Sequence, residues 1–153
     1  IAGGKAEDVV SAEAMLRQSI QNGNALKKLE AFVKAQGGTG EEVLHPEKLP
    51  AASMQIKVSS PQNGYISHIQ CDEIGVCSLI LGGGRETKDS VIDLSVGLEL
   101  KKKVGDYAEK GETLAVLHAN EQEKAEQAEE RFLRAYRFSE TKPPKRPMIF
   151  GEI

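Results

Sequence analysis

Three consecutive glycines, Gly82 to Gly84, follow an apolar run and come directly before Arg85, with Lys88 three residues further on. The free backbone N–H groups of such a loop can hold a phosphate when the loop follows a strand and opens a helix. Here the preceding run is predicted to be a helix, so the negative end of its dipole would face the loop. The pattern also lacks the P-loop lysine and hydroxyl and does not fit G-x-G-x-x-G. It therefore favours a helix end followed by a flexible loop, in which Arg85 and Lys88 could still attract an anion.

The other residues with catalytic or metal-binding chemistry are scattered along the chain. His45, His68 and His118 fall in different predicted elements, and no two of them have metal-ligand spacing on one element. Cys71 and Cys77 are six residues apart, which matches neither a zinc site nor a disulfide framework. Two free thiols in a reducing compartment are the simpler interpretation. The sequence thus predicts no catalytic residue, no cofactor-binding residue and no metal site.

The composition is that of an ordinary globular protein, with 153 residues, 39% hydrophobic and 28% charged residues, and a net charge of −3. That charge favours neither nucleic acid nor an anionic membrane as a partner. No apolar run approaches the ~18 residues of a membrane span, and no secretory signal is recognisable, so we expect the cytoplasm. The first residue is Ile1 rather than Met, which indicates a piece of a longer protein.

The pattern of apolar and turn residues divides the chain into three parts. Residues 1–36 are predicted to form two helices, because apolar residues recur at spacings of three and four. Asp8 or Ser11 could cap the first helix, and Gly23 suits the left-handed position after it. Residues 37–51, rich in glycine and proline, are predicted to be a linker. A helical pair of this kind buries only one face, so it needs another surface to pack on.

Residues 52–153 have the character of a small β domain with two helices. Short apolar runs alternate with Gly/Asp turns, which indicates an α+β fold containing a small barrel or sandwich. A helix capped by Asp72 is predicted to end at Gly82. A terminal helix is predicted over residues 120–137, with Asn120 and Glu123 as a capping box. Its predicted buried stripe is Ala125, Ala128, Phe132 and Tyr136. The last residues, 148–153, are expected to dock as an extended tail or to fray.

Five short motifs carry more specific information than the periodicity of apolar residues. In chain order they are "AQGG", "SPQNGYI", "LGGGR", "VGDYAEKGE" and "LHAN". Together they resemble the C-terminal part of the bacterial pyrimidine-nucleoside phosphorylases, relatives of the thymidine phosphorylases. The resemblance implies a homodimeric pentosyltransferase that cleaves uridine, thymidine or deoxyuridine with phosphate, giving the base and a pentose 1-phosphate. It implies that residues 1–36 belong to the α/β body of the enzyme. Residues 52–153 would form a hammerhead-like, barrel-sandwich-like C-terminal subdomain.

The same resemblance implies that the active site lies outside this chain. The family signatures, which read like K-H-S-T-G-G-V-G-D-K, S-G-R-G and T-G-G-T-x-D-x-x-E, do not occur in the sequence. The phosphate and potassium sites would lie upstream, so no catalytic or ligand residue carries over and the fragment alone is expected to be inactive. Its partner would be the remainder of the phosphorylase chain.

A functional hypothesis remains for the loop that contains Gly82, Gly83, Gly84, Arg85 and Lys88. Loops that close over an active site need mobile, glycine-rich segments. The resemblance implies that a loop of the C-terminal subdomain can approach the helical domain when the enzyme closes. We therefore expect this loop to be an interdomain contact.

Two other function classes compete with this interpretation. The stretch "LKKKVGDYAEKGETLAVLHA" also resembles biotinyl and lipoyl carrier domains, which share a turn of this type between short strands. Carriers need a lysine on a hairpin, whereas Lys124 falls in the predicted terminal helix, so carrier function is disfavoured. A non-enzymatic interaction domain is the third class.

Overall fold

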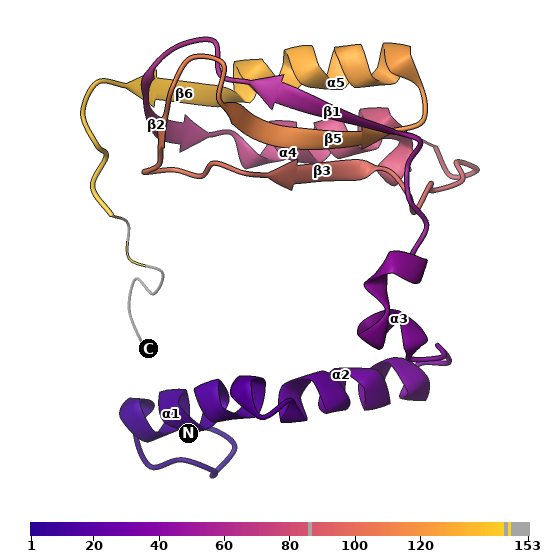
Figure 1. Ribbon diagram of the computed structural model, residues 1–153, viewed down its shortest axis with the longest axis vertical. Coiled ribbons are helices and arrows are strands. Elements are labelled where there is room, and N and C mark those ends of the chain that lie inside the picture. Colours follow the sequence, from indigo (N-terminus) through magenta and orange to yellow (C-terminus); the bar gives the residue numbers. More distant parts are fainter. Residues whose placement is uncertain (86, 146, 148–153) are drawn as a thin grey trace. The chain divides into compact units, whose positions relative to one another are not determined.

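The computed structural model describes residues 1–85, 87–145 and 147, and it divides the chain into two compact units, residues 1–49 and 50–153. The fold is α+β, as predicted, but the strands of the described part form two open three-stranded sheets instead of a closed barrel (Figure 1). Within residues 1–85, 87–145 and 147, no helix has the length and apolar character needed to cross a membrane.

The first unit contains two helices, α1 (Val9–Gln21) and α2 (Asn24–Ala35), then a short helix α3 (Glu41–Leu44) and a 3-10 turn η1 (Pro46–Lys48). The Asp8 carboxylate caps α1 by accepting a hydrogen bond from the Ser11 N–H at 2.7 Å. Gly23 turns the chain into α2 with φ of 77°. Both local predictions are therefore confirmed.

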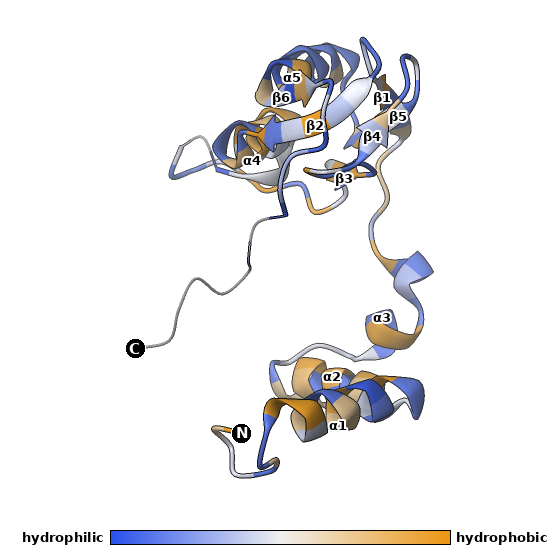
Figure 2. Cartoon of the chain, turned by 90° about the vertical axis from the view of Figure 1, so that its left-hand side faces the viewer, coloured by the Kyte–Doolittle hydropathy of each residue, from blue (hydrophilic) through white to orange (hydrophobic). Residues whose placement is uncertain are grey.

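Neither long helix of the first unit buries a residue within the described structure. Hydrophobic residues recur along both α1 and α2, as the colours of Figure 2 show, and many of them are exposed. The most exposed are Val10 at 78%, Ile20 at 72%, Val9 at 69%, Leu16 at 66% and Phe32 at 61%. The helical pair has formed its caps and turns, but it has no hydrophobic core of its own.

The second unit is built on two antiparallel sheets. One has the strand order β1-β5-β3 and the other β4-β2-β6. The strands are β1 (Met54–Ser59), β2 (Gly64–Ile69), β3 (Gly97–Leu100), β4 (Tyr107–Ala108), β5 (Thr113–Ala119) and β6 (Tyr136–Ser139). Consecutive strands always lie in different sheets, so the chain crosses between the sheets after each of β1 to β5.

Hydrogen bonds join the turn after β1 to the turn after β4. The Ser60 N–H donates to the Glu112 carbonyl oxygen, and the Gly111 N–H donates to the Ser60 carbonyl oxygen, each at 2.8 Å. The Lys110 N–H donates to the Asn63 Oδ1 at 2.6 Å. Because backbone groups that leave a ladder must find partners elsewhere, these bonds hold one edge where both sheets meet.

Helix α4 (Cys71–Ser78) follows β2 and continues into a π-helical segment, η2 (Leu79–Gly83). Gly82, with φ of 103°, lies in the left-handed region near the end of that segment, close to the predicted helix end. The predicted cap was wrong, since the helix begins at Cys71 with Gln70 as its N-cap, which leaves Asp72 in the first turn. There the Asp72 carboxylate is placed favourably for the helix dipole without capping the helix.

Helix α5 (Gln122–Ala135) is shorter than the predicted 120–137. Its N-cap is Glu121 and has no side-chain cap bond, so the Asn120–Glu123 capping box was wrong. The reason is competition: the Asn120 side-chain oxygen accepts the Ser53 N–H at 2.8 Å instead. At the other end, Tyr136 already pairs with Ile69 in the second sheet.

The core of the second unit lies under α5. Ala125, Ala128, Phe132 and Ala135 on one face of the helix are fully buried. The small alanines allow α4 to pack closely, and the Cys77 thiol donates to the Ala128 carbonyl oxygen at 3.5 Å. The buried face of α5 is the predicted stripe, and it includes the Phe132 ring stacked on Tyr136 at 4.6 Å. The predicted tail, 148–153, lies outside the described residues.

Replacing Phe132 by alanine should strongly destabilise the second unit, because the ring is fully buried. Large-to-small substitution of a buried Phe costs about 3–5 kcal/mol. Phe32→Ala is the matched control, since that ring is 61% exposed, and a change within about 0.5 kcal/mol is expected. Urea unfolding followed by tyrosine fluorescence measures this, because Tyr65, Tyr107 and Tyr136 all lie in the second unit. Equal effects of the two substitutions would contradict the assigned core.

Candidate functional site

The candidate site is the glycine-rich loop, residues 82–95, which connects η2 to β3 and of which residue 86 is not described. Its two ends are held together, because the Asp93 N–H donates to the Gly82 carbonyl oxygen at 3.0 Å. Between these ends the Ser90 N–H donates to the Thr87 carbonyl oxygen at 3.2 Å, which forms a tight turn. The loop therefore leaves and re-enters the domain at one place. We call this base, formed by Gly82 and Asp93, the neck of the loop.

Backbone conformation or close packing explains why each of the three positions 82–84 is a glycine. Gly82 has a positive φ of 103°, which side chains other than glycine rarely adopt. A Cβ on Gly83 would lie 2.8 Å from the Ser78 Oγ, and one on Gly84 would lie 2.9 Å from the Leu79 Cδ1. The glycines thus let the chain turn back closely over the end of the helix. The helical segment therefore ends at these glycines, as the sequence analysis favoured over a phosphate-binding loop.

Asn120 joins the neck of the glycine-rich loop to the first sheet. Its side-chain nitrogen donates to the Asp93 Oδ2 at 2.7 Å and to the Ser95 Oγ at 2.9 Å. Its side-chain oxygen accepts the Ser53 N–H at 2.8 Å, just before β1. One amide therefore links the loop, the start of β1 and the end of β5. The amide oxygen and the amide nitrogen of Asn120 both have hydrogen-bond partners, and these partners determine which way the amide group points.

The Asp93 carboxylate is the acceptor at the centre of this network. Its Oδ1 accepts the Ser95 Oγ–H at 2.6 Å and the Ser95 N–H at 2.9 Å. The hydrogen bonds from Ser95, followed by the one from Asn120, lower the pKa of Asp93 from its ordinary value. The ionised carboxylate is therefore the form that fits the neck.

The outer part of the glycine-rich loop displays apolar and cationic side chains together. Val91 is 91% exposed and Leu94 is 79% exposed, while Arg85 and Lys88 are also exposed. Exposed apolar residues close to one another mark a contact surface more often than isolated ones do. Asp89 is exposed in the same loop, so the displayed charges are of both signs.

The structure does not bring the predicted histidines together. His45 lies in the first unit, where its Nδ1 is 3.1 Å from the Glu47 Oε1, whereas His68 and His118 lie on β2 and β5 in different sheets. Among the described residues, no group of three or more His, Cys, Asp or Glu side chains could hold a metal ion. Cys71 and Cys77 are free thiols, and burial raises the pKa of Cys77.

Sequence reasoning missed the residues that hold the loop. Asp93 was interpreted only as a strand or turn residue, and Asn120 as a helix cap. The one sequence signal for Asn120 was its place in the motif "LHAN". Its partners lie 27 and 67 residues away, so no local pattern could have revealed the network.

The fold and the loop together define a small α+β domain with an exposed glycine-rich loop whose ends are anchored by Asn120. Residues 65–139 match the family described as "Pyrimidine nucleoside phosphorylase C-terminal domain". The chain is 44% identical over 119 residues to the pyrimidine-nucleoside phosphorylases of Staphylococcus aureus strains USA300, NCTC 8325 and COL. The match covers 78% of this chain and 28% of each relative, so the chain spans less than a third of their length. The chain belongs to the pyrimidine-nucleoside phosphorylase family and corresponds to its C-terminal part, which confirms the resemblance.

Substituting Asn120 by alanine should loosen the neck of the glycine-rich loop, because three hydrogen bonds lose their partner. At about 0.5–1.5 kcal/mol for each hydrogen bond, protection of the loop amides should fall by at least roughly tenfold. Native-state amide exchange of residues 87–95 measures it. Gln122→Ala, which removes a nearby exposed amide side chain on α5, is the control and should leave the exchange unchanged. Unchanged exchange in the Asn120 variant would contradict the anchoring role.

The lowered pKa of Asp93 predicts how the neck responds to acid. A group with a depressed pKa in the folded state stabilises the fold above its unfolded pKa, and that contribution is lost as the pH falls through the folded value. The Ser95 amide chemical shift should therefore titrate with a midpoint below the ~3.9 of an ordinary Asp. In Asn120→Ala the midpoint should move up towards that value. A midpoint at or above the ordinary value in the unsubstituted chain would rule out the network as described.

Proposed function

We propose that this chain is the C-terminal part of an enzyme that cleaves pyrimidine nucleosides with phosphate, giving the free base and a pentose 1-phosphate. The observation that supports this is the 44% identity to proteins named pyrimidine-nucleoside phosphorylase, together with the family match over residues 65–139. The proposed substrates are uridine, thymidine or deoxyuridine. The proposed assembly is a homodimer of the longer chain in the cytoplasm.

Within that enzyme, the chain has a structural role and supports closure, while catalysis takes place elsewhere. The family's signature motifs do not occur among its 153 residues, which supports placing the phosphate and potassium sites in the part of the enzyme upstream of it. The remainder of the phosphorylase chain is then the partner. Its α/β body would cover the apolar faces of α1 and α2, whose Val10 and Ile20 are 78% and 72% exposed here.

The glycine-rich loop is the proposed contact with the helical domain when the enzyme closes. The loop includes Gly82, Gly83, Gly84, Arg85 and Lys88, and the Asp93–Asn120 network supports its neck. An anchored neck with an exposed outer part is what a closing contact needs, because the loop must be presented in one place and still adapt. The exposed basic and apolar side chains described above would make the contact.

Carrier function is not proposed. Lys124 lies inside α5, where its Nζ is 2.7 Å from the Glu121 Oε1, rather than on a hairpin between strands. A non-enzymatic interaction domain is the alternative, and the activity measurement below separates it from the phosphorylase.

Phosphorolysis of uridine and thymidine, followed by ultraviolet absorbance, tests the placement of the active site. The 153-residue chain should give no turnover and no thermal shift with phosphate or nucleoside, whereas the longer protein should give both. Turnover by the chain alone would overturn this placement. Inactivity of the longer protein would favour the interaction domain.

The role of the loop is tested in the longer protein by replacing Arg85 and Lys88 with alanine. Loss of two exposed contacts of about 0.5 kcal/mol each should reduce kcat roughly fivefold, if closure limits the rate. Lys57→Ala, an exposed lysine on β1, is the control and should leave kcat unchanged. An unchanged kcat in the double variant would refute the contact role.

A further inference from the structure

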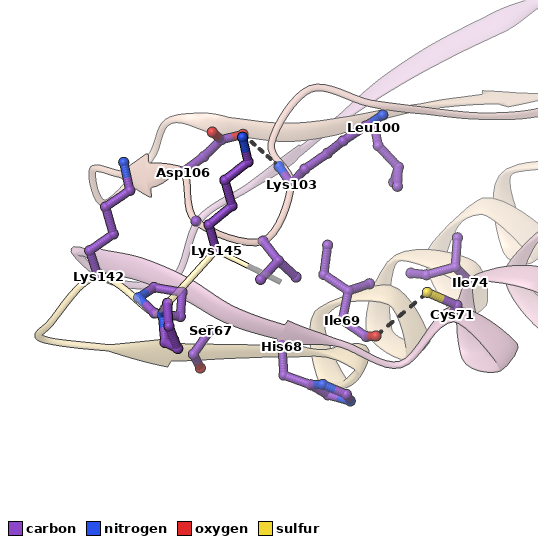
Figure 3. Close-up of a pocket in the computed structure, with 14 residues that line it drawn as sticks. Ser67, His68, Ile69, Cys71, Ile74, Leu100, Lys103, Asp106, Lys142 and Lys145 are labelled. Carbon is purple, nitrogen blue, oxygen red and sulfur yellow. Dashed lines mark hydrogen bonds between the residues drawn. The ribbon is translucent and has the colours of Figure 1, made fainter. Parts of the chain in front are cut away.

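The second unit contains a cavity of about 890 Å³ that the proposed function does not use (Figure 3). It is bounded by the end of β2, the start of α4, the turn formed by residues 103–106 and the segment 142–145. None of its lining residues belongs to the glycine-rich loop. Its volume lies in the range of about 300–1,000 Å³ that is typical of sites for small organic ligands.

Most of the cavity wall is apolar. Ile69 and Ile74 contribute from β2 and α4, Leu100 and Val104 from the end of β3 and the turn after it, and Pro143 and Pro144 from the later segment. Such a wall gains free energy by covering an apolar body, whether aromatic or branched aliphatic. It offers little to a sugar or to a fully hydrated ion.

Three exposed lysines, Lys103, Lys142 and Lys145, also line the cavity, and their ammonium groups lie at separate points of its rim (Figure 3). Within residues 1–85, 87–145 and 147, no ion pair neutralises any of them. The one carboxylate in the lining, that of Asp106, accepts the Lys103 backbone N–H at 2.7 Å and so serves the turn. Because ammonium groups only donate hydrogen bonds, the site selects an anion.

The turn that carries Lys103 is held rigidly against β2. The Gly105 N–H donates to the Ile66 carbonyl oxygen at 2.8 Å, and the Ile66 N–H donates to the Asp106 carbonyl oxygen at 2.9 Å. The Asp106 N–H closes the turn onto the Lys103 carbonyl oxygen at 3.0 Å. This side of the cavity is therefore formed before any ligand arrives, which lowers the cost of binding.

We propose that this cavity binds a small organic anion, consisting of one aromatic or branched aliphatic body that carries a carboxylate, sulfonate or phosphate group. The apolar wall receives the body, and the lysines at the rim attract the charged group. A nucleic acid is disfavoured as the ligand, since the chain carries a net charge of −3.

The test uses the 153-residue chain and two probes that differ in one group. These are 8-anilinonaphthalene-1-sulfonate and N-phenyl-1-naphthylamine, which has the same aromatic body without the sulfonate. We expect the sulfonate to bind more tightly, and its chemical-shift changes in an amide correlation spectrum to centre on Ile69, Val104 and Gly105. Changes confined to the exposed faces of α1 and α2, or equal affinity for both probes, would overturn the proposal.

Variants separate the charged contacts from the apolar ones. Lys103→Met and Lys142→Met should each weaken the sulfonate by about threefold and leave the uncharged probe unchanged, as expected for partly exposed charge pairs. Lys57→Met, an exposed lysine outside the cavity, is the matched control and should change neither affinity. Val104→Trp should weaken both probes by filling the cavity, and its half-exposed position makes the substitution tolerable to the fold. An equal loss in Lys57→Met and Lys103→Met would overturn the proposal. Since no turnover is measured, these outcomes are independent of the phosphorylase assignment.

Discussion

Burial of one face of α5 is the interaction on which the second unit depends. Ala125, Ala128, Phe132 and Ala135 are all fully buried, and they close the space between α4 and the two sheets. Each sheet has only three strands, so its stability depends on covering its apolar face. The helix supplies the common surface, and an ion pair between Arg131 and Glu73, with Nε and Oε2 2.6 Å apart, fixes α5 against α4 at its half-exposed edge. Removing one charge of this pair would leave the other partly desolvated, which would destabilise the fold.

The same packing determines where the glycine-rich loop can lie. Helix α4 must end where η2 meets the core, and the close contacts of Gly83 and Gly84 let the chain fold back over that end. The loop then has to return to the first sheet through β3, which pairs with β5. Because α5 begins directly after β5, Asn120 stands where the loop, β1 and β5 meet. A residue at this junction can bond to all three, which explains why it forms the neck instead of capping the helix.

The two units differ in a way that bears on function. The second unit buries a continuous core, whereas α1 and α2 bury no residue within the described structure. Helices of 13 and 12 residues are marginal in water without a packed face. The first unit therefore depends on another surface for most of its stability. Membership of a family in which the match covers only 28% of each relative fits that dependence. The cavity beside β2 is different in kind, because the second unit forms it from its own residues.

By itself, the sequence determined the features that depend on near neighbours. It predicted the Asp8 cap, the left-handed Gly23, the helix end at the glycines and the buried stripe of α5, because each is set by residues within a few positions. It also identified the family, since motif order is a property of the chain. Tertiary structure alone decided that the strands form two sheets, that Asn120 bonds to Ser53 and Asp93, and that Lys103, Lys142 and Lys145 line one cavity. These groups are far apart in the chain, and only strand pairing and packing between distant segments bring them together.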